Sequence, residues 1–218
     1  TSKESVSAIT GLIAYVDSSG VLRPWVFAPE GVFLYDGTSF YKIVDHVNRF
    51  GENESTTGQS PVIWDVDNVE GGYLVYPQGR NIRRVWWGDN NTLKKDNIAP
   101  TYDSQGMPGF RDGPVLQLAA TNNFLFAAIG GNSSSTTGGI YMRRAKDPVP
   151  LGWSGPIYDT ATANRQIRAM AITSYNDGIV RLHFAEDTAT ANDTQPLLLR
   201  NITSDPTTVA SYAYSPSL

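Results

Sequence analysis

The chain has 218 residues, of which 17 are Lys or Arg and 21 are Asp or Glu, so its formal net charge is −4. It contains no cysteine and only two histidines, which excludes disulfides, thiolate nucleophiles and metal sites built from cysteine or several histidines. The negative charge argues against a nucleic-acid partner, and no apolar run is long enough to insert into a membrane.

Short segments rich in Val, Ile, Tyr, Phe and Trp alternate with turns rich in Gly, Asp, Asn and Pro, a pattern typical of all-β proteins. In chain order, a first strand is predicted at residues 9–16, 62–66, 115–120 and 167–172. A second strand begins after each turn, at intervals of 52, 51 and 55 residues, with Gly20, Gly72, Asn123 and Gly178. Third strands follow at residues 31–35, 82–87, 139–142 and 197–200, and the clearest fourth strands at 40–44 and 212–214.

This recurrence predicts four units of about 50 residues, each a meander of about four antiparallel strands. The second strands are apolar on both faces, as in Val21 and Leu22 or Phe124 and Leu125. A sheet with one wet face would alternate, whereas sheets stacked face to face bury both faces. We therefore predict an all-β, β-propeller-like fold of about four blades, with a β-sandwich or barrel as the alternative. A single domain covers residues 1–218, with units at about 6–50, 60–105, 113–160 and 165–215.

The sequence GVFLYDGTSF at residues 31–40 joins an apolar strand to a Tyr-Asp-Gly turn. It resembles the hairpins of degenerate β-propellers found in phage tail and other virion proteins and in bacterial surface lectins. The resemblance implies a non-enzymatic structural or adhesive module, a virion component such as a phage tail or capsid-associated propeller. Its implied location is a virion or the extracellular space, and its implied partners are other proteins of the same assembly, further copies of itself, or glycans. The alternative hypotheses are a carbohydrate-binding propeller lectin and, less favoured, a glycoside hydrolase.

One predicted strand of the second unit, GRNIRRVWW, combines three arginines with two tryptophans. Strand alternation puts Arg84 and Trp86 on one face and Arg83, Val85 and Trp87 on the other. Each face is suited to an Arg–Trp cation–π contact, and an exposed tryptophan beside arginine suits a sugar ring, a phosphate or a partner protein. The competing interpretation is packing between blades, with arginine head groups reaching solvent. Arg83, Arg84 and Trp86 are therefore candidate ligand or partner contacts.

Trp153 is a fourth candidate contact, because Gly152 and Gly155 around it predict a loop. Binding residues are more frequent on loops than on scaffold strands. The alternative is a loop anchored on the edge of a blade by its indole.

Asp65 and Asp67 lie two residues apart and are predicted on one face of a strand. Paired carboxylates can bind Ca²⁺, but the spacing differs from that of an EF-hand. The alternative is a strand end whose turn is capped by Asp and Asn side chains. We predict no cofactor and no catalytic residue, with calcium near Asp65 and Asp67 as a weaker alternative, and we assign neither His46 nor His183 to catalysis. Five Asn-x-Ser/Thr sequons fit a secreted glycoprotein and an unglycosylated virion protein equally well: Asn53, Asn90, Asn132, Asn192 and Asn201.

Overall fold

The computed structural model describes residues 6, 8–45, 60–67, 69, 71–100, 113–131, 138–145, 152–160, 166–174, 180–186, 197–202 and 211–214. These residues form sixteen strands in four antiparallel sheets, each with its strands in chain order. Sheet 1 contains β1 (Gly11–Val16), β2 (Leu22–Ala28), β3 (Gly31–Tyr35) and β4 (Phe40–Asp45). Sheet 2 contains β5 (Val62–Trp64), β6 (Tyr73–Gln78), β7 (Asn81–Gly88) and β8 (Thr92–Asn97), with the short 3₁₀ helix η1 (Asp89–Asn91) before β8.

Sheets 3 and 4 repeat this plan in the second half of the chain. Sheet 3 contains β9 (Val115–Ala120), β10 (Phe124–Ile129), β11 (Gly139–Arg144) and β12 (Trp153–Asp159). Sheet 4 contains β13 (Ile167–Ser174), β14 (Val180–Glu186), β15 (Leu197–Ile202) and β16 (Ser211–Tyr214). The prediction of an all-β fold of four-stranded meanders is therefore confirmed. In the described part of the chain, no helix has the length and hydropathy needed to cross a membrane.

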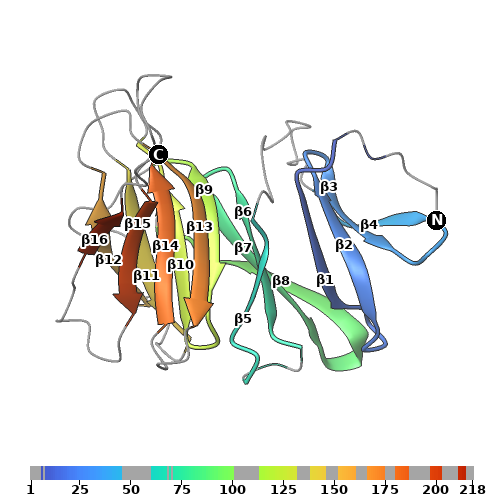
Figure 1. Ribbon diagram of the computed structural model, residues 1–218. Coiled ribbons are helices and arrows are strands. Elements are labelled where there is room, and N and C mark those ends of the chain that lie inside the picture. Colours follow the sequence, from blue (N-terminus) through green and yellow to red (C-terminus); the bar gives the residue numbers. More distant parts are fainter. Residues whose placement is uncertain are drawn as a thin grey trace.

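Consecutive sheets pack against one another. Figure 1 shows sheet 1 on one side of the molecule, sheet 2 in the middle, and sheets 3 and 4 overlapping on the other side. The first strands of sheets 2, 3 and 4 lie next to one another, since β9 contacts β5 and β13. The stacking explains the apolar second strands. Every residue of β6 is buried, as is nearly all of β10, because both faces of these strands meet a neighbouring sheet.

Three apolar clusters fill the spaces between consecutive sheets. Between sheets 1 and 2 the buried residues are Tyr15, Trp25, Phe27, Val32, Val44, Leu74, Tyr76 and Val85. Between sheets 2 and 3 they include Trp64, Tyr73, Val75, Ile82, Ile98, Leu118, Leu125, Tyr141 and Trp153. Between sheets 3 and 4 they are Ala119, Phe126, Ala128, Ile140, Ile167, Leu182 and Phe184. The core is thus a series of sheet-to-sheet interfaces, each built from aromatic and branched side chains.

Aromatic donors also hydrogen-bond the backbone of the neighbouring sheet. The Tyr15 hydroxyl donates to the carbonyl of Gly72 at 2.6 Å, and the Trp87 indole donates to the carbonyl of Val16 at 2.9 Å. These carbonyls end strands or lie in turns, where the ladder supplies no partner. Each such bond fixes the position of one sheet relative to the next.

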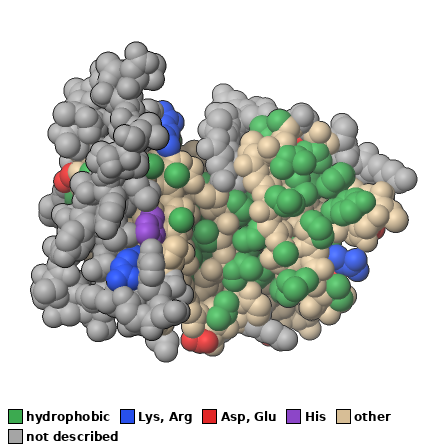
Figure 2. All heavy atoms as spheres, in the orientation of Figure 1, with side chains coloured by type: hydrophobic (Ala, Val, Ile, Leu, Met, Phe, Trp, Pro, Cys, Tyr) green, Lys and Arg blue, Asp and Glu red, His purple; other side chains and the backbone are tan. Residues whose placement is uncertain are grey.

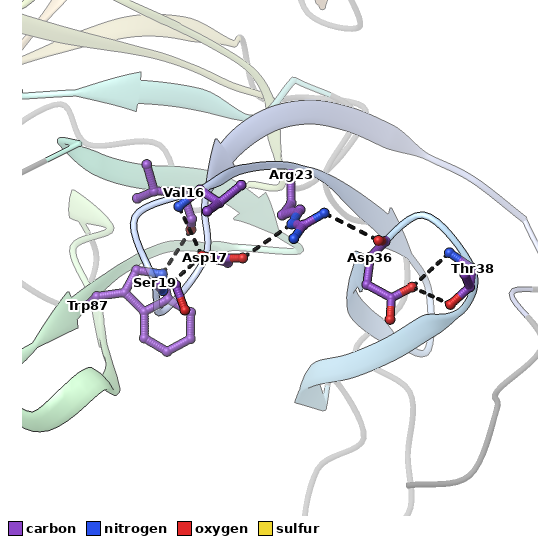
Figure 3. A network of polar contacts seen from close by, with 8 residues as sticks. Val16, Asp17, Ser19, Arg23, Asp36, Thr38 and Trp87 are labelled. Atoms are coloured by element: carbon purple, nitrogen blue, oxygen red, sulfur yellow. Dashed lines mark hydrogen bonds and ion pairs between the residues drawn. The ribbon is translucent and has the colours of Figure 1, made fainter.

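The turn from β1 to β2 is closed by Asp17 (Figure 3). Its carboxylate accepts hydrogen bonds from the amides of Ser19 at 2.8 Å and Val21 at 3.0 Å, and it pairs with the Arg23 guanidinium at 3.2 Å. Burial opposes ionisation, but the two amides and the guanidinium outweigh it and lower the pKa of Asp17 below its ordinary value. The turn therefore depends on the ionised carboxylate.

The Tyr-Asp-Gly turn between β3 and β4 uses Asp36 in the same way. Its carboxylate accepts from the amides of Thr38 at 2.8 Å and Ser39 at 2.9 Å, and these bonds lower its pKa. Arg23 donates to the carbonyl of Asp36 at 3.2 Å and so links the two turns (Figure 3).

The interface between sheets 2 and 3 supplies a stability prediction. Val75 is 0% exposed within it, whereas Val66, in the turn after β5, is 48% exposed. We expect Val75→Ala to lower the free energy of unfolding by about 2 to 3 kcal/mol through lost burial and an unfilled cavity. We expect Val66→Ala to change it by less than about 0.5 kcal/mol. Urea unfolding measures the free energy of unfolding of both variants, and equal losses would contradict the burial of Val75 between sheets 2 and 3.

Alkaline pH supplies a second test. Burial, with a smaller contribution from the charge of Tyr73, raises the pKa of Tyr15 from 10.0 to about 12. The folded protein therefore holds this phenol protonated at pH values where the unfolded chain ionises it. The corresponding stabilisation, up to about 2 kcal/mol, is present below pH 10 and is lost as the pH rises towards 12. Urea unfolding between these pH values should show a shallower decline for Tyr15→Phe than for the wild type, and parallel declines would refute this assignment.

Candidate functional site

The turns that follow β5 and β9 meet at one end of sheets 2 and 3. Asn122, in the turn after β9, accepts a hydrogen bond from the amide of Val66 at 3.0 Å. Its side-chain nitrogen donates to a carboxylate oxygen of Asp67 at 2.6 Å. One asparagine from sheet 3 therefore orders the acidic turn of sheet 2.

Asp65 and Asp67 do not share a strand face, so that prediction is wrong. β5 ends at Trp64, and Asp65 adopts a left-handed backbone conformation with a φ of 55°, which ends the strand alternation. Asp65 is 2% exposed, whereas Asp67 is exposed. The observed arrangement is the alternative, a strand end capped by Asp and Asn side chains.

Among the described residues, this geometry brings no third acidic side chain to Asp65 and Asp67 that could serve as a calcium ligand. Across the described ranges, no group of three or more His, Cys, Asp or Glu side chains could hold a metal ion. Binding of Ca²⁺ near Asp65 and Asp67 stays a prediction.

An aromatic row begins beside the acidic turn. Trp64, Tyr73 and Trp86 lie opposite one another on β5, β6 and β7, and exposed Lys94 on β8 continues the row. The ring centroids of Trp64 and Tyr73 are 6.3 Å apart, and those of Tyr73 and Trp86 are 5.4 Å apart. Trp86 is only half-buried, so the row reaches the surface at β7.

Arg84 lies against this row. Its guanidinium is 4.5 Å from the Tyr73 ring centroid and 5.3 Å from that of Trp86, and it forms an ion pair with Asp96 on β8. The predicted shared face of Arg84 and Trp86, and their cation–π contact, are confirmed. The carboxylate fixes the guanidinium over the two rings.

The acidic turn and the aromatic row form one electrostatic unit. Burial raises the pKa of Tyr73, the charge of Arg84 opposes this shift, and the charges of Asp65 and Asp96 add to it. The Tyr73 phenol is therefore close enough to Asp65 of the acidic turn and to Arg84 of the aromatic row for both charges to act on its pKa. We call the whole set the acidic–aromatic corner, and it comprises Trp64, Asp65, Asp67, Tyr73, Arg84, Trp86, Asp96 and Asn122.

Arg83 lies on the opposite face of β7, as predicted. Its guanidinium donates to the Gln78 side chain at 2.6 Å. On the same face Val85 is buried in the cluster with sheet 1, and Trp87 lies 6.3 Å from Trp25, centroid to centroid. The structure therefore separates Arg83 from the acidic–aromatic corner.

Trp153 is not in a loop, which corrects the prediction. It is the first residue of β12, pairs with Arg143 and is 3% exposed. Its indole donates to the carbonyl of Ile98 at 2.6 Å and belongs to the cluster between sheets 2 and 3. The Trp153 side chain fills the space between sheets 2 and 3, and little of its indole surface is left exposed to a ligand.

His183 lies on β14, with its Nε2 atom 2.7 Å from the hydroxyl of Thr173. Burial, assisted by the charge of Arg181, lowers the pKa of His183. His46 and the sequons Asn53, Asn132 and Asn192 lie outside the described residues. Asn90 is exposed in η1, and Asn201 lies in β15.

The sequence interpretation missed Tyr73, Asp96 and Asn122 as members of the corner. Asn122 follows the first strand of its unit, as Asp65 and Asp67 follow theirs. Alignment of the repeat units would have placed these residues at the same end, because the first strands lie side by side. No local sequence pattern marks Asp96, because only the pairing of β7 with β8 places it opposite Arg84.

Comparisons with known proteins bear on the fold. No family model and no curated protein matches the chain. Among solved structures, it is similar to an α-L-arabinanase from Penicillium chrysogenum complexed with arabinobiose, with a TM-score of 0.53 and 14% sequence identity. The match covers 94% of this chain and 66% of that chain, so the chain spans just under two thirds of the neighbour's length.

The arabinanase is a five-bladed β-propeller, and at this identity the likeness shows the fold alone. The predicted propeller-like fold is confirmed. The prediction of a non-enzymatic virion module is wrong on this finding, because the matched propeller is a carbohydrate-active enzyme and nothing links the chain to phage.

Asn122 supplies a test of the acidic turn. Asn122→Ala removes one hydrogen bond to a backbone amide and one to a carboxylate, and we expect it to lower the free energy of unfolding by about 1 kcal/mol. Asn123→Ala, also exposed and in the same turn, is the matched control, with a change of less than about 0.5 kcal/mol. Urea unfolding gives both values, and the same small change in both variants would contradict the bridging role of Asn122.

Proposed function

We propose that this chain is a carbohydrate-binding β-propeller module and that a saccharide binds at the acidic–aromatic corner. Two findings support the proposal: the fold is similar to that of an arabinanase bound to arabinobiose, and the corner offers aromatic and charged groups together. The observation that carries it is the half-buried Trp86 beside Arg84, with Asp96 paired to the guanidinium.

The chemistry of the corner fits a sugar better than a purely apolar ligand. The indole of Trp86 offers apolar surface to the C–H face of a pyranose or furanose ring. Exposed Asp67 and Lys94 provide an acceptor and a donor for hydroxyl groups at the rim. Because Asp96 and Tyr73 hold Arg84 in place, the site is preorganised before a ligand arrives.

Glycoside hydrolysis is the second candidate function. Such enzymes use two carboxyl groups with different roles, one as an acid and one as a base or nucleophile. Asp65 and Asp67 occupy one turn in different surroundings, since the first is buried beside Trp64 and the second is exposed and hydrogen-bonded to Asn122. Different surroundings are what allow two carboxyl groups to take separate roles.

Hydrolysis is tested by incubating the protein with arabinan and other polysaccharides and measuring new reducing ends. Activity lost in Asp65→Asn and in Asp67→Asn, with the fold intact by circular dichroism, would support it. Binding without release of reducing ends would leave the module as a lectin. An extracellular location stays a prediction.

Binding is tested by titration calorimetry against arabinobiose, longer arabino-oligosaccharides and a panel of other neutral and acidic oligosaccharides. We expect Trp86→Ala to weaken binding about tenfold or more through loss of ring contact. Trp87→Ala is the matched control, because Trp87 is the adjacent tryptophan on the opposite face of β7 and packs against sheet 1. It should leave affinity unchanged even where it lowers stability. Absence of binding across the panel, or equal loss in both variants, would contradict the proposal.

A further inference from the structure

Lys94 is the outermost side chain of the aromatic row. It lies directly opposite Trp86 in the pairing of β7 with β8, and it is exposed. Within the described part of the chain, Lys94 forms no ion pair and no hydrogen bond. Its ammonium group is therefore a cation that stands beside an aromatic surface and is not paired with a carboxylate of the described residues.

Gly88 holds a place for this lysine on β7. A Cβ atom at Gly88 would lie 2.9 Å from both the Cγ and the Cε atoms of Lys94, so the lysine stem fills the space that a side chain at position 88 would take. Gly88 has an ordinary extended φ of −99°, so the glycine provides space here rather than an unusual backbone conformation. A stem that rests on the strand restricts the ammonium before a ligand arrives.

The negative charges of the corner are paired or lie at the other end of the row. Asp96, on the same face of β8 as Lys94, forms an ion pair with Arg84. Asp65 and Asp67 follow β5, which is the opposite edge of the sheet from β8. At a spacing of about 4.8 Å between neighbouring strands, these edges are roughly 14 Å apart, beyond the roughly 8 Å over which surface charges interact at physiological salt. The row is therefore acidic at one end and basic at the other.

A preference for an anion on this protein has to come from a local contact. The chain carries a net charge of −4, which repels anions at long range. Figure 2 shows the Lys and Arg side chains of the visible face at separate places rather than in one basic patch. A single ammonium beside an aromatic ring is a contact of this local kind.

We propose that the saccharide bound at the acidic–aromatic corner is an acidic one, with its ring on Trp86 and its anionic group, a carboxylate or a sulfate, paired with Lys94. This inference rests on the proposed saccharide site and adds the class of sugar that the site takes. The Cβ atoms of residues directly opposite each other on antiparallel strands are about 4.5 to 5.5 Å apart. The indole and the ammonium can therefore contact the ring and a substituent of the same sugar.

The charge of the ligand matters because an ammonium also donates to neutral hydroxyl groups. A hydrogen bond between an ammonium and an anionic oxygen is roughly twice as strong as one between neutral groups. An acidic sugar therefore gains more from Lys94 than the neutral sugar of the same shape, and salt weakens this advantage.

The test is titration calorimetry of the 218-residue chain with two matched pairs of ligands. One pair is a galacturonate trisaccharide and its carboxyl-reduced form, and the other is a sulfated galactose trisaccharide and its desulfated form. We expect the acidic member of at least one pair to bind about fivefold more tightly than its neutral counterpart, and this preference to shrink at high salt. The pair that shows the preference identifies the anionic group as a carboxylate or a sulfate.

Two variants test the role of Lys94 itself. Lys94→Gln keeps a hydrogen-bond donor and removes the charge, so it should abolish the preference for the acidic member. Gly88→Ala keeps the charge but displaces the lysine stem, so it should reduce the preference as well. Lys95→Gln is the matched control, because Lys95 is also exposed but pairs with Val85 and so belongs to the opposite face of β8. It should keep the wild-type preference, and circular dichroism checks that all three variants are folded.

The outcomes separate this inference from the proposed function. Equal affinity for both members of both pairs would overturn the inference and leave saccharide binding intact. Binding of no saccharide at all would refute the proposed function and the inference together. A preference that Lys94→Gln or Gly88→Ala leaves unchanged, or that Lys95→Gln lowers equally, would overturn the assignment of the anionic group to Lys94.

Discussion

The structure depends on the need to cover both faces of each sheet. The second strands β6 and β10 carry apolar side chains on both sides, so neither sheet 2 nor sheet 3 could exist with one face in water. Stacking in a row satisfies this requirement for the central sheets. It leaves the outer face of sheet 1, where Leu12 and Leu22 are exposed, and that of sheet 4, where the described residues of β13 and β14 include both alanines and the polar Thr173, Arg181 and His183.

The same requirement decides the use of the tryptophans. Trp153 and Trp87 both fill gaps between sheets and donate to carbonyls of the neighbouring sheet, at Ile98 and Val16. Trp86 differs because its position on β7 lies at the end of an interface, where the sheets no longer cover it fully. The acidic–aromatic corner is thus the place where sheet packing ends and polar turns begin.

The corner is held together across two sheets. Asn122 orders the turn that contains Asp67, and Asp96 holds Arg84 over the rings of Tyr73 and Trp86. These contacts join residues far apart in the chain and fix charged groups beside an aromatic surface before a ligand binds. The proposed saccharide site rests on these contacts, and the fold it belongs to is similar to that of an arabinanase.

The sequence by itself determined the all-β class, the four units and the face shared by Arg84 and Trp86, since these follow from turn residues, spacing and strand alternation. The sequence could not show that Trp153 is buried, because its burial depends on packing against sheet 2. It also could not show that Asp65 and Asp67 lie in different surroundings, because the left-handed backbone conformation of Asp65 ends the strand alternation. The pairing of Arg84 with Asp96 and the approach of Asn122 to Asp67 were decided only by the tertiary structure. Strand register and sheet packing bring such groups together, and no local pattern encodes them.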